Sequence, residues 1–181
     1  MTTIIPKDSW VPVTVETFST PGARTPAALW KAIKEFSVET NPRYQPTATA
    51  TFCNIYLWDV LISLNAQYSH WVDPTTKAPS TMGHGNVELS ANGTVDWLAQ
   101  SGRQFGWNAA DLSHAVLAAQ QGKPAIVVWK NPTGRSGHVA ILCPDATTAN
   151  PFTAQAGASN WEHKQIAYGF GRLPVSIYVH E

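Results

Sequence analysis

The sequence is poor in charged residues and lacks both a basic excess and a long apolar run. Only 13% of its 181 residues are charged, and the acidic and basic residues cancel to a formal net charge of zero. No basic field is present to bind nucleic acid or an anionic membrane surface. No apolar run approaches the roughly 20 residues of a transmembrane helix, so we expect no membrane span.

Cysteine is also scarce, and no export signal is evident. The two cysteines, Cys53 and Cys143, are too few for a disulfide framework. The first eight residues lack the basic-then-apolar order of a signal peptide. We therefore expect the chain to be made in the cytoplasm without a signal of its own.

Apolar residues and tryptophan are plentiful. The apolar content is 44%, with eight tryptophans, as in a globular chain with a full core. The length favours a single domain, residues 1–181, made of an extended N-terminal arm (1–24) and a core (25–181). We expect the arm to pack on the core through Trp10, Val13, Val15 and Phe18.

The segment around Cys53 is the first candidate for chemistry. Residues 55–64 are apolar on nearly all sides, which predicts a covered central helix, with Thr51 as its cap. Cys53 would lie in the first turn, where unpaired N–H groups and the helix dipole favour the nucleophilic thiolate. The alternative is that Cys53 is simply a small buried residue.

A second segment supplies a histidine. His138 follows a glycine-bearing turn and opens an apolar strand over residues 137–143. A thiol nucleophile needs an imidazole to accept its proton, and the fold can bring distant residues together. Strand alternation places Cys143 on the opposite face from His138, so Cys143 is predicted to be a core residue and no partner for Cys53.

Together these segments resemble a known group of enzymes. The helix-borne Cys53, the strand Gly137-His138-Val139-Ala140 and the following Gln155-Ala156-Gly157 are similar to the papain-like NlpC/P60 and CHAP cell-wall peptidases and amidases. The resemblance spans roughly residues 45–171. It implies an α+β fold in which a central helix carries the cysteine and packs on an antiparallel sheet of about five strands. It also implies Cys53 as nucleophile and His138 as base, without a cofactor or metal.

The resemblance places a third catalytic group on the strand after the histidine. Gln155 is the first choice, because it is polar in an otherwise apolar strand and could orient the imidazole. Asn150, Asn160 and Asp145 are the alternates.

Four residues are candidates for substrate contact: Arg43, Tyr44, Asn54 and Trp71. Arg43 could bind a substrate carboxylate or form a salt bridge within its loop. Trp71 could offer an apolar wall to a peptide or sugar. The oxyanion hole would use the backbone N–H of Cys53, with Tyr44, Gln45 or Asn54 as side-chain donors. His70, Asp73 and His84 could bind a metal, although their spacing is irregular.

The predicted function is hydrolysis of peptide or amide bonds in peptidoglycan stem peptides through an acyl-enzyme. The enzyme would be an endopeptidase or an N-acetylmuramoyl-L-alanine amidase, acting as a phage endolysin or as a secreted antibacterial effector. Phage lysis or a secretion system would deliver it to the cell wall. We expect a monomer, for which an immunity or inhibitor protein is a candidate partner.

Two other functions remain open. One is a papain-like deamidase or transferase toxin that uses the same Cys53 and His138 on a protein substrate. The other is a non-enzymatic wall-binding module with a decayed site, in which Cys53 would be unreactive.

Sequence patterns also predict the elements around these residues. Thr25 and Pro26 open a helix, and Asn108 is expected to cap a second helix over residues 109–121 that Gly122 ends. Residues 65–93 have weak periodicity and predict an irregular segment, followed by a short helix capped by Asn92 or Thr94. The expected strands are residues 124–129, 137–143, 152–157, 165–170 and 175–180.

Overall fold

The computed structural model of the chain describes residues 3–181 and shows an α+β fold built on a six-stranded sheet. The strands follow the order β4-β9-β5-β6-β7-β8, and every neighbouring pair is antiparallel. They are β4 (Trp107–Ala110), β5 (Ala125–Trp129), β6 (His138–Leu142), β7 (Phe152–Gln155), β8 (Trp161–Gln165) and β9 (Ser176–His180). The predicted class is confirmed, with six strands in place of about five.

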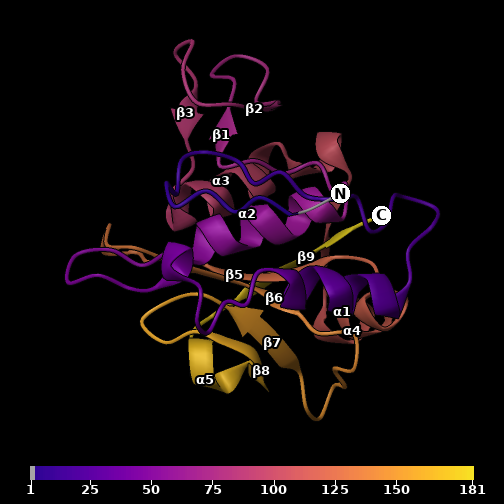
Figure 1. Cartoon of the computed structure of the whole chain (residues 1–181). Coiled ribbons are helices and arrows are strands. Elements are labelled where there is room, and N and C mark those ends of the chain that lie inside the picture. Colours follow the sequence, from indigo (N-terminus) through magenta and orange to yellow (C-terminus); the bar gives the residue numbers. More distant parts are fainter. Residues whose placement is uncertain (1–2) are drawn as a thin grey trace.

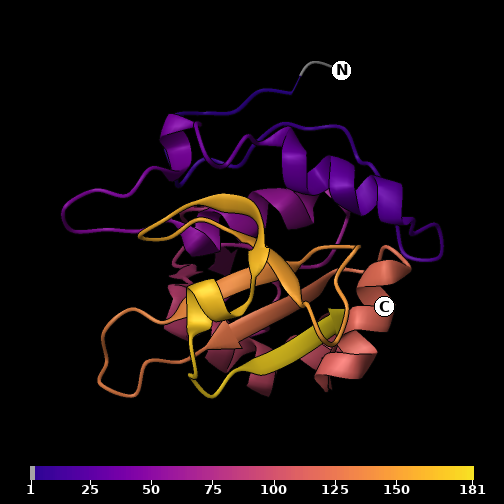
Figure 2. The same cartoon turned by 90° about the horizontal axis from the view of Figure 1, so that it is seen from below.

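The helices pack on this sheet and on one another. They are α1 (Pro26–Glu35), α2 (Cys53–Ser63), α3 (Ala91–Gln100), α4 (Leu112–Gln120) and α5 (Ala167–Phe170), with 3-10 turns η1 (Pro42–Tyr44) and η2 (Gly102–Phe105). α2, α3 and α4 contact strands of the sheet, and α1 packs on α2 and α4. Figure 1 shows α2 crossing the middle of the molecule. Figure 2 shows α1 and α4 at the same end of it.

α2 is the covered central helix that its composition predicts. Every residue of α2 except Asn54 and Ile62 is buried. Its predicted cap is wrong: Phe52 occupies the cap position and makes no side-chain cap hydrogen bond. α1 begins as predicted, because Thr25 accepts a hydrogen bond from the Ala28 N–H at 3.1 Å.

Two predicted boundaries are wrong. Residues 107–110 form β4, paired with β9, instead of starting a helix. The helix begins only at Leu112, after Asp111 accepts a hydrogen bond from the His114 N–H at 2.8 Å. The strand predicted at residues 165–170 is instead the end of β8 followed by the short helix α5. At residues 107–110 strand pairing prevails over the local signal.

The segment predicted to be irregular contains a second sheet. β1 (Trp71–Val72), β2 (Pro79–Ser80) and β3 (Val87–Glu88) pair in the order β2-β1-β3. This small sheet projects from the body beside α3 (Figure 1). Ser90 then caps α3 by accepting a hydrogen bond from the Gly93 N–H at 3.1 Å, so neither Asn92 nor Thr94 is the cap.

The N-terminal arm runs in an extended path over the body. Within residues 3–24, a single antiparallel bridge joins Ile4 and Thr14. Val13 is buried, and Val15 and Phe18 pack partly buried against the core. The prediction that Trp10 packs on the core is wrong, because its side chain is 50% exposed.

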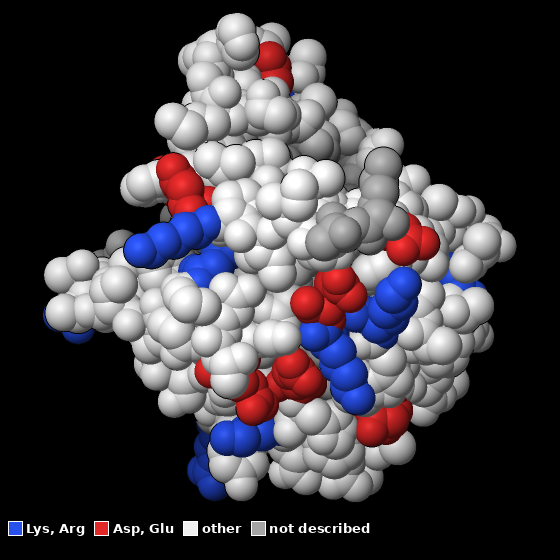
Figure 3. All heavy atoms as spheres, in the orientation of Figure 1, with Lys and Arg blue, Asp and Glu red and all other residues white. Residues whose placement is uncertain are grey.

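The charged residues are scattered over the surface. On the face shown in Figure 3, basic and acidic side chains are interspersed, with no large field of one sign. Among residues 3–181, no helix has both the length and the apolar character needed to cross a membrane.

Candidate active site

Cys53 is the first residue of α2 and lines a pocket of about 510 Å³. Its side chain is almost fully buried, and the structure contains no disulfide to it. The pocket wall combines arm residues 7–10, residues 50–55 at the start of α2, His70 and Glu88 from the small sheet region, Ser90 and Ala91 at the start of α3, and Ser136.

Burial dominates the electrostatics of the Cys53 thiol. Burial raises its pKa, and the backbone N–H groups of Val139, Asn54 and Cys53 itself oppose that rise only in part. The N–H groups predicted to favour a thiolate are therefore present, but the resting form is the neutral thiol. The Val139 contact also places the sulfur beside β6, the strand that His138 opens.

His138 opens β6 and is oriented by Gln155 on the neighbouring strand. The Nε2 atom of His138 lies 2.6 Å from Oε1 of Gln155, and the Gln155 amide nitrogen donates to the Ser159 carbonyl at 3.2 Å. With its nitrogen used by Ser159, the amide turns its oxygen to the imidazole. Nε2 then carries the proton, and Nδ1 remains free to accept one.

The surroundings of His138 favour a neutral ring. Burial lowers the pKa of His138, and the hydrogen bond that the ring makes to Gln155 raises it by less. Together with the raised pKa of Cys53, this favours the neutral form of both the thiol and the imidazole. The arrangement suits a base that accepts the thiol proton during attack, and it disfavours a preformed ion pair.

α5 forms the back wall behind the imidazole. The Phe170 ring packs against His138 with centroids 4.8 Å apart. A Cβ atom on Gly169 would lie only 2.3 Å from Oε1 of Gln155, so the absence of a side chain there makes room for the amide. The Gly169-Phe170-Gly171 run predicts a bend or close packing at the sheet edge, but nothing in it indicates contact with His138 or Gln155.

The loop that leads into His138 is held by α3. Asn92 donates to the carbonyl of Arg135 at 2.8 Å and accepts from the Asn131 N–H at 2.9 Å. A Cβ atom on Gly137 would lie 2.4 Å from both Oδ1 of Asn92 and the Trp129 carbonyl. Gly137 therefore lets the loop pass close to α3 before the chain enters β6.

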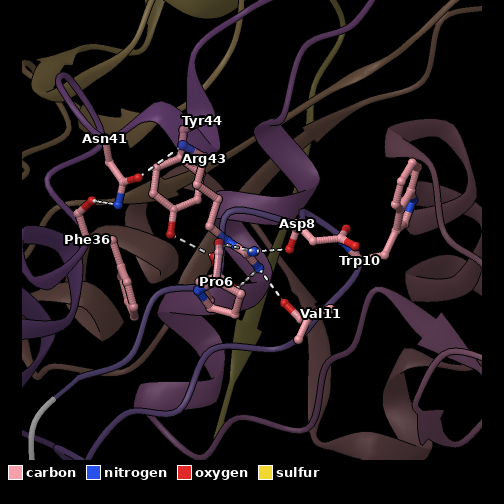
Figure 4. Close-up of polar contacts among 9 residues, drawn as sticks. Pro6, Asp8, Trp10, Val11, Phe36, Asn41, Arg43 and Tyr44 are labelled. Atoms are coloured by element: carbon pink, nitrogen blue, oxygen red, sulfur yellow. Dashed lines mark hydrogen bonds and ion pairs between the residues drawn. The ribbon is translucent and has the colours of Figure 1, made fainter.

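Arg43 and Tyr44 do not face the pocket. The Arg43 side chain is 1% exposed and pairs with the fully buried Asp59 of α2, with Nε 2.7 Å from Oδ2. The Tyr44 hydroxyl donates to the same Oδ2 atom at 2.7 Å. Figure 4 shows these residues beside the backbone of the arm. Direct substrate contact by either is contradicted, and the salt-bridge alternative for Arg43 is the observed one.

Asn54 does face the pocket, together with His70. The Asn54 amide nitrogen donates to the Leu89 carbonyl at 2.9 Å and lies 3.2 Å from Nδ1 of His70. Oε1 of Glu88 lies 3.0 Å from Nε2 of His70 but outside the N–H direction. Burial lowers the pKa of His70, and Glu88 opposes this shift.

The remaining residues predicted to contact substrate or the oxyanion either lie outside the pocket or have other hydrogen-bond partners. Trp71 is half-buried in β1 and is not part of the lining of the Cys53 pocket. The Gln45 amide donates to carbonyls of the preceding turn, and the amide nitrogen of Asn54 donates to the Leu89 carbonyl. No predicted side-chain donor is thus free for an oxyanion. The first N–H groups of α2 remain, because a helix start leaves them without intrahelical partners.

The alternates for the third catalytic residue bind partners other than His138. Asn160 donates to the Val38 and Tyr44 carbonyls, and Asp145 pairs with His163. Asn150 accepts from the Gln165 amide at 2.8 Å. His70, Asp73 and His84 do not converge either: across residues 3–181, no three His, Cys, Asp or Glu side chains are grouped to hold a metal.

The comparisons with known proteins add no family. No protein-family model matches this chain, and no curated protein sequence matches it.

Proposed function

We propose that the chain is a papain-like cysteine hydrolase that cuts peptide or amide bonds of peptidoglycan through an acyl-enzyme. One observation carries the proposal: the helix-borne Cys53 lies beside the strand that holds His138, and Gln155 binds Nε2 of that histidine at 2.6 Å. This supports assigning the roles of nucleophile, base and orienting group to Cys53, His138 and Gln155, which come from three distant segments. The choice of peptidoglycan rests on the resemblance of these three segments to NlpC/P60 and CHAP enzymes.

The first half-reaction follows from the neutral resting state. The Cys53 sulfur attacks the substrate carbonyl while its proton passes to Nδ1 of His138, the nitrogen that Gln155 leaves free. The carbonyl oxygen becomes negatively charged, and the unpaired N–H groups at the start of α2 stabilise it. The imidazolium then protonates the leaving amine as the carbon–nitrogen bond breaks, which leaves a thioester on Cys53.

Water completes the cycle. His138, neutral again, takes a proton from a water molecule as its oxygen attacks the thioester. The carbon–sulfur bond breaks, the carboxylic product leaves, and the proton returns to Cys53. Gln155 accepts the hydrogen bond from Nε2 in every step, so the ring keeps one tautomer.

The biological setting is part of the proposal. The enzyme would act as an endopeptidase or an N-acetylmuramoyl-L-alanine amidase on stem peptides, after delivery by phage lysis or a secretion system. It would work as a monomer without a cofactor. An immunity or inhibitor protein would cover the Cys53 pocket in a producing cell.

The test uses purified protein and peptidoglycan sacculi, with soluble products resolved by mass spectrometry. Wild type is expected to release fragments whose masses name the bond, and Cys53→Ala is expected to release none. Cys143→Ala is the matched control, because Cys143 is also free and buried but follows the far end of β6 from His138 and does not line the Cys53 pocket. Loss of activity in Cys143→Ala with activity kept in Cys53→Ala would refute the assignment.

A non-enzymatic wall-binding module is the second candidate, and the raised pKa of Cys53 favours it. Such a protein would bind sacculi and leave them intact, and the Cys53→Ala variant would bind equally well. A deamidase or transferase toxin would leave sacculi intact without binding them, while its thiol still reacted with iodoacetamide.

A further inference from the structure

The N-terminal arm is fastened to the helix that carries Cys53. The guanidinium of Arg43 has five N–H donors, two of which bind the Asp59 carboxylate at 2.7 and 3.0 Å. The other three bind the carbonyls of Pro6 at 3.0 Å, Val11 at 2.9 Å and Asp8. Figure 4 shows these carbonyls converging on the guanidinium. Every donor is used, and the arm supplies three of the five acceptors.

This arrangement fixes residues 6–11 in place. The Arg43 side chain is almost fully buried, so lifting the arm would leave three buried charged donors without partners. Leaving such groups unpaired is unfavourable. The arm is therefore a permanent part of the pocket and not a loosely attached tail.

The part of the arm that Arg43 holds in place faces the Cys53 pocket. Residues 7–10 line the pocket that Cys53 lines. Asp8 accepts a hydrogen bond from the Trp10 N–H at 3.0 Å, and the next residue, Val11, is held by Arg43. The backbone of Trp10 is thus held on both sides, although half of its side chain is exposed. The half-buried Phe52 and the buried Ile55 extend the apolar lining.

We propose that Trp10 is a specificity-determining residue of the Cys53 pocket, and that its indole stacks on a C–H-rich face of the substrate next to the scissile bond. A large and partly exposed aromatic ring on a backbone that is held in place is suited to this contact. The face could be an aminosugar ring or an aliphatic side chain of the stem peptide. This inference rests on the proposed function for the identity of the substrate. That Trp10 forms one wall of the Cys53 pocket, here called the Trp10 wall, rests on the contacts above.

The first experiment tests, without any substrate, whether Trp10 limits access to Cys53. Cys53 is alkylated at pH 9 by iodoacetamide and by a bulky peptide chloromethyl ketone, and the labelled peptide is identified by mass spectrometry. Trp10→Ala is expected to raise the rate with the bulky reagent several-fold more than the rate with iodoacetamide. Leu117→Ala, which removes a comparably exposed apolar side chain from α4 outside the pocket, is expected to change neither rate.

The second experiment identifies the substrate face. Calorimetry on the Cys53→Ala background measures binding of a disaccharide-linked stem peptide and of the same peptide without sugar. Trp10→Ala is expected to weaken binding by about three- to tenfold, and Trp10→Phe by less. An effect on the sugar-linked ligand alone assigns the contact to the sugar ring, and an equal effect on both ligands assigns it to the peptide.

The outcomes separate this inference from the proposed function. If Trp10→Ala leaves the ratio of the alkylation rates with the bulky reagent and with iodoacetamide unchanged, Trp10 does not form a wall of the pocket. This holds whatever the experiment with sacculi shows. If that ratio changes but neither ligand binds wild type or Cys53→Ala, Trp10 does form a wall of the pocket, and the proposed peptidoglycan substrate is refuted. Unchanged affinity for both ligands in Trp10→Ala refutes the stacking contact.

Discussion

Nε2 of His138 and Oε1 of Gln155 lie 2.6 Å apart, on adjacent antiparallel strands. An amide in this position orients the imidazole but stabilises its charged form less than a carboxylate would. Burial lowers the pKa of the same histidine. The ring is thus held in one tautomer, and burial favours its neutral form.

Replacing Gln155 by glutamate is predicted to change the pH dependence of hydrolysis. A carboxylate facing Nε2 stabilises the imidazolium and so raises the pKa of His138. The base works only when neutral, so the acidic limb of kcat/KM is expected to move to higher pH. Gln155→Ala should instead lower kcat/KM on the order of 100-fold, because the ring loses its orientation. A pH profile that does not move in Gln155→Glu would contradict a role beside His138.

Gly169 offers an independent way to disturb the same contact. Its Cβ position lies 2.3 Å from Oε1 of Gln155, and that amide is held by both His138 and the Ser159 carbonyl. Gly169→Ala is therefore expected to displace the amide and to lower activity in the same direction as Gln155→Ala. Combined with Gln155→Ala, it should add little further loss, because the displaced group is already gone. Additive losses in the double variant would contradict this coupling.

The reactivity of Cys53 should report its neutral resting state. Because its pKa is raised, the rate of iodoacetamide labelling is expected to be low at pH 7 and to rise with pH through pH 9 without a plateau. A small cysteine peptide, with an ordinary pKa of about 8.5, is the comparison and should level off earlier. His138→Ala should abolish hydrolysis while changing this labelling profile little. Labelling that is fast and flat from pH 5 to 8 would instead indicate an ion pair.

The sequence was sufficient for the parts of the site that local patterns encode. The apolar surroundings of Cys53 predicted a covered helix, and the turn before His138 predicted a strand. Both predictions depend on residues close to one another in sequence. The family resemblance placed a third group on the next strand, where Gln155 is the partner that the structure shows. Their roles in catalysis remain predictions.

Features made by long-range contacts could not be predicted in this way. Arg43 preceded the cysteine helix and was a candidate for substrate contact, yet Asp59 and three carbonyls of the arm occupy all its donors. Nothing near Trp10 in the sequence indicated that the arm reaches the Cys53 pocket. Similarly, residues 107–110 carry a cap-like Asn108, but pairing with β9 makes them a strand.

Stability is predicted to fall in mild acid because of His180, a buried residue at the end of β9. Nε2 of His180 accepts a hydrogen bond from the Gln67 N–H at 3.2 Å, and Nδ1 lies 3.3 Å from Nη2 of Arg24. Burial, with a further contribution from Arg24, lowers the pKa of His180 to about 4. The folded protein thus binds this proton less tightly than the unfolded chain, whose histidine pKa is about 6.5.

The sign of the effect follows from that difference. The free energy of unfolding is expected to decrease as pH falls from about 6.5 to about 4, by up to about 3 kcal/mol from this residue. Urea unfolding at several pH values measures it, and His180→Gln should show a shallower slope. Some slope should persist, because burial also lowers the pKa of His70 and of His138. His114→Gln, which removes an exposed histidine of α4, is the control and should follow the wild-type curve. An unchanged slope in His180→Gln would show that this histidine is not the acid-sensitive group.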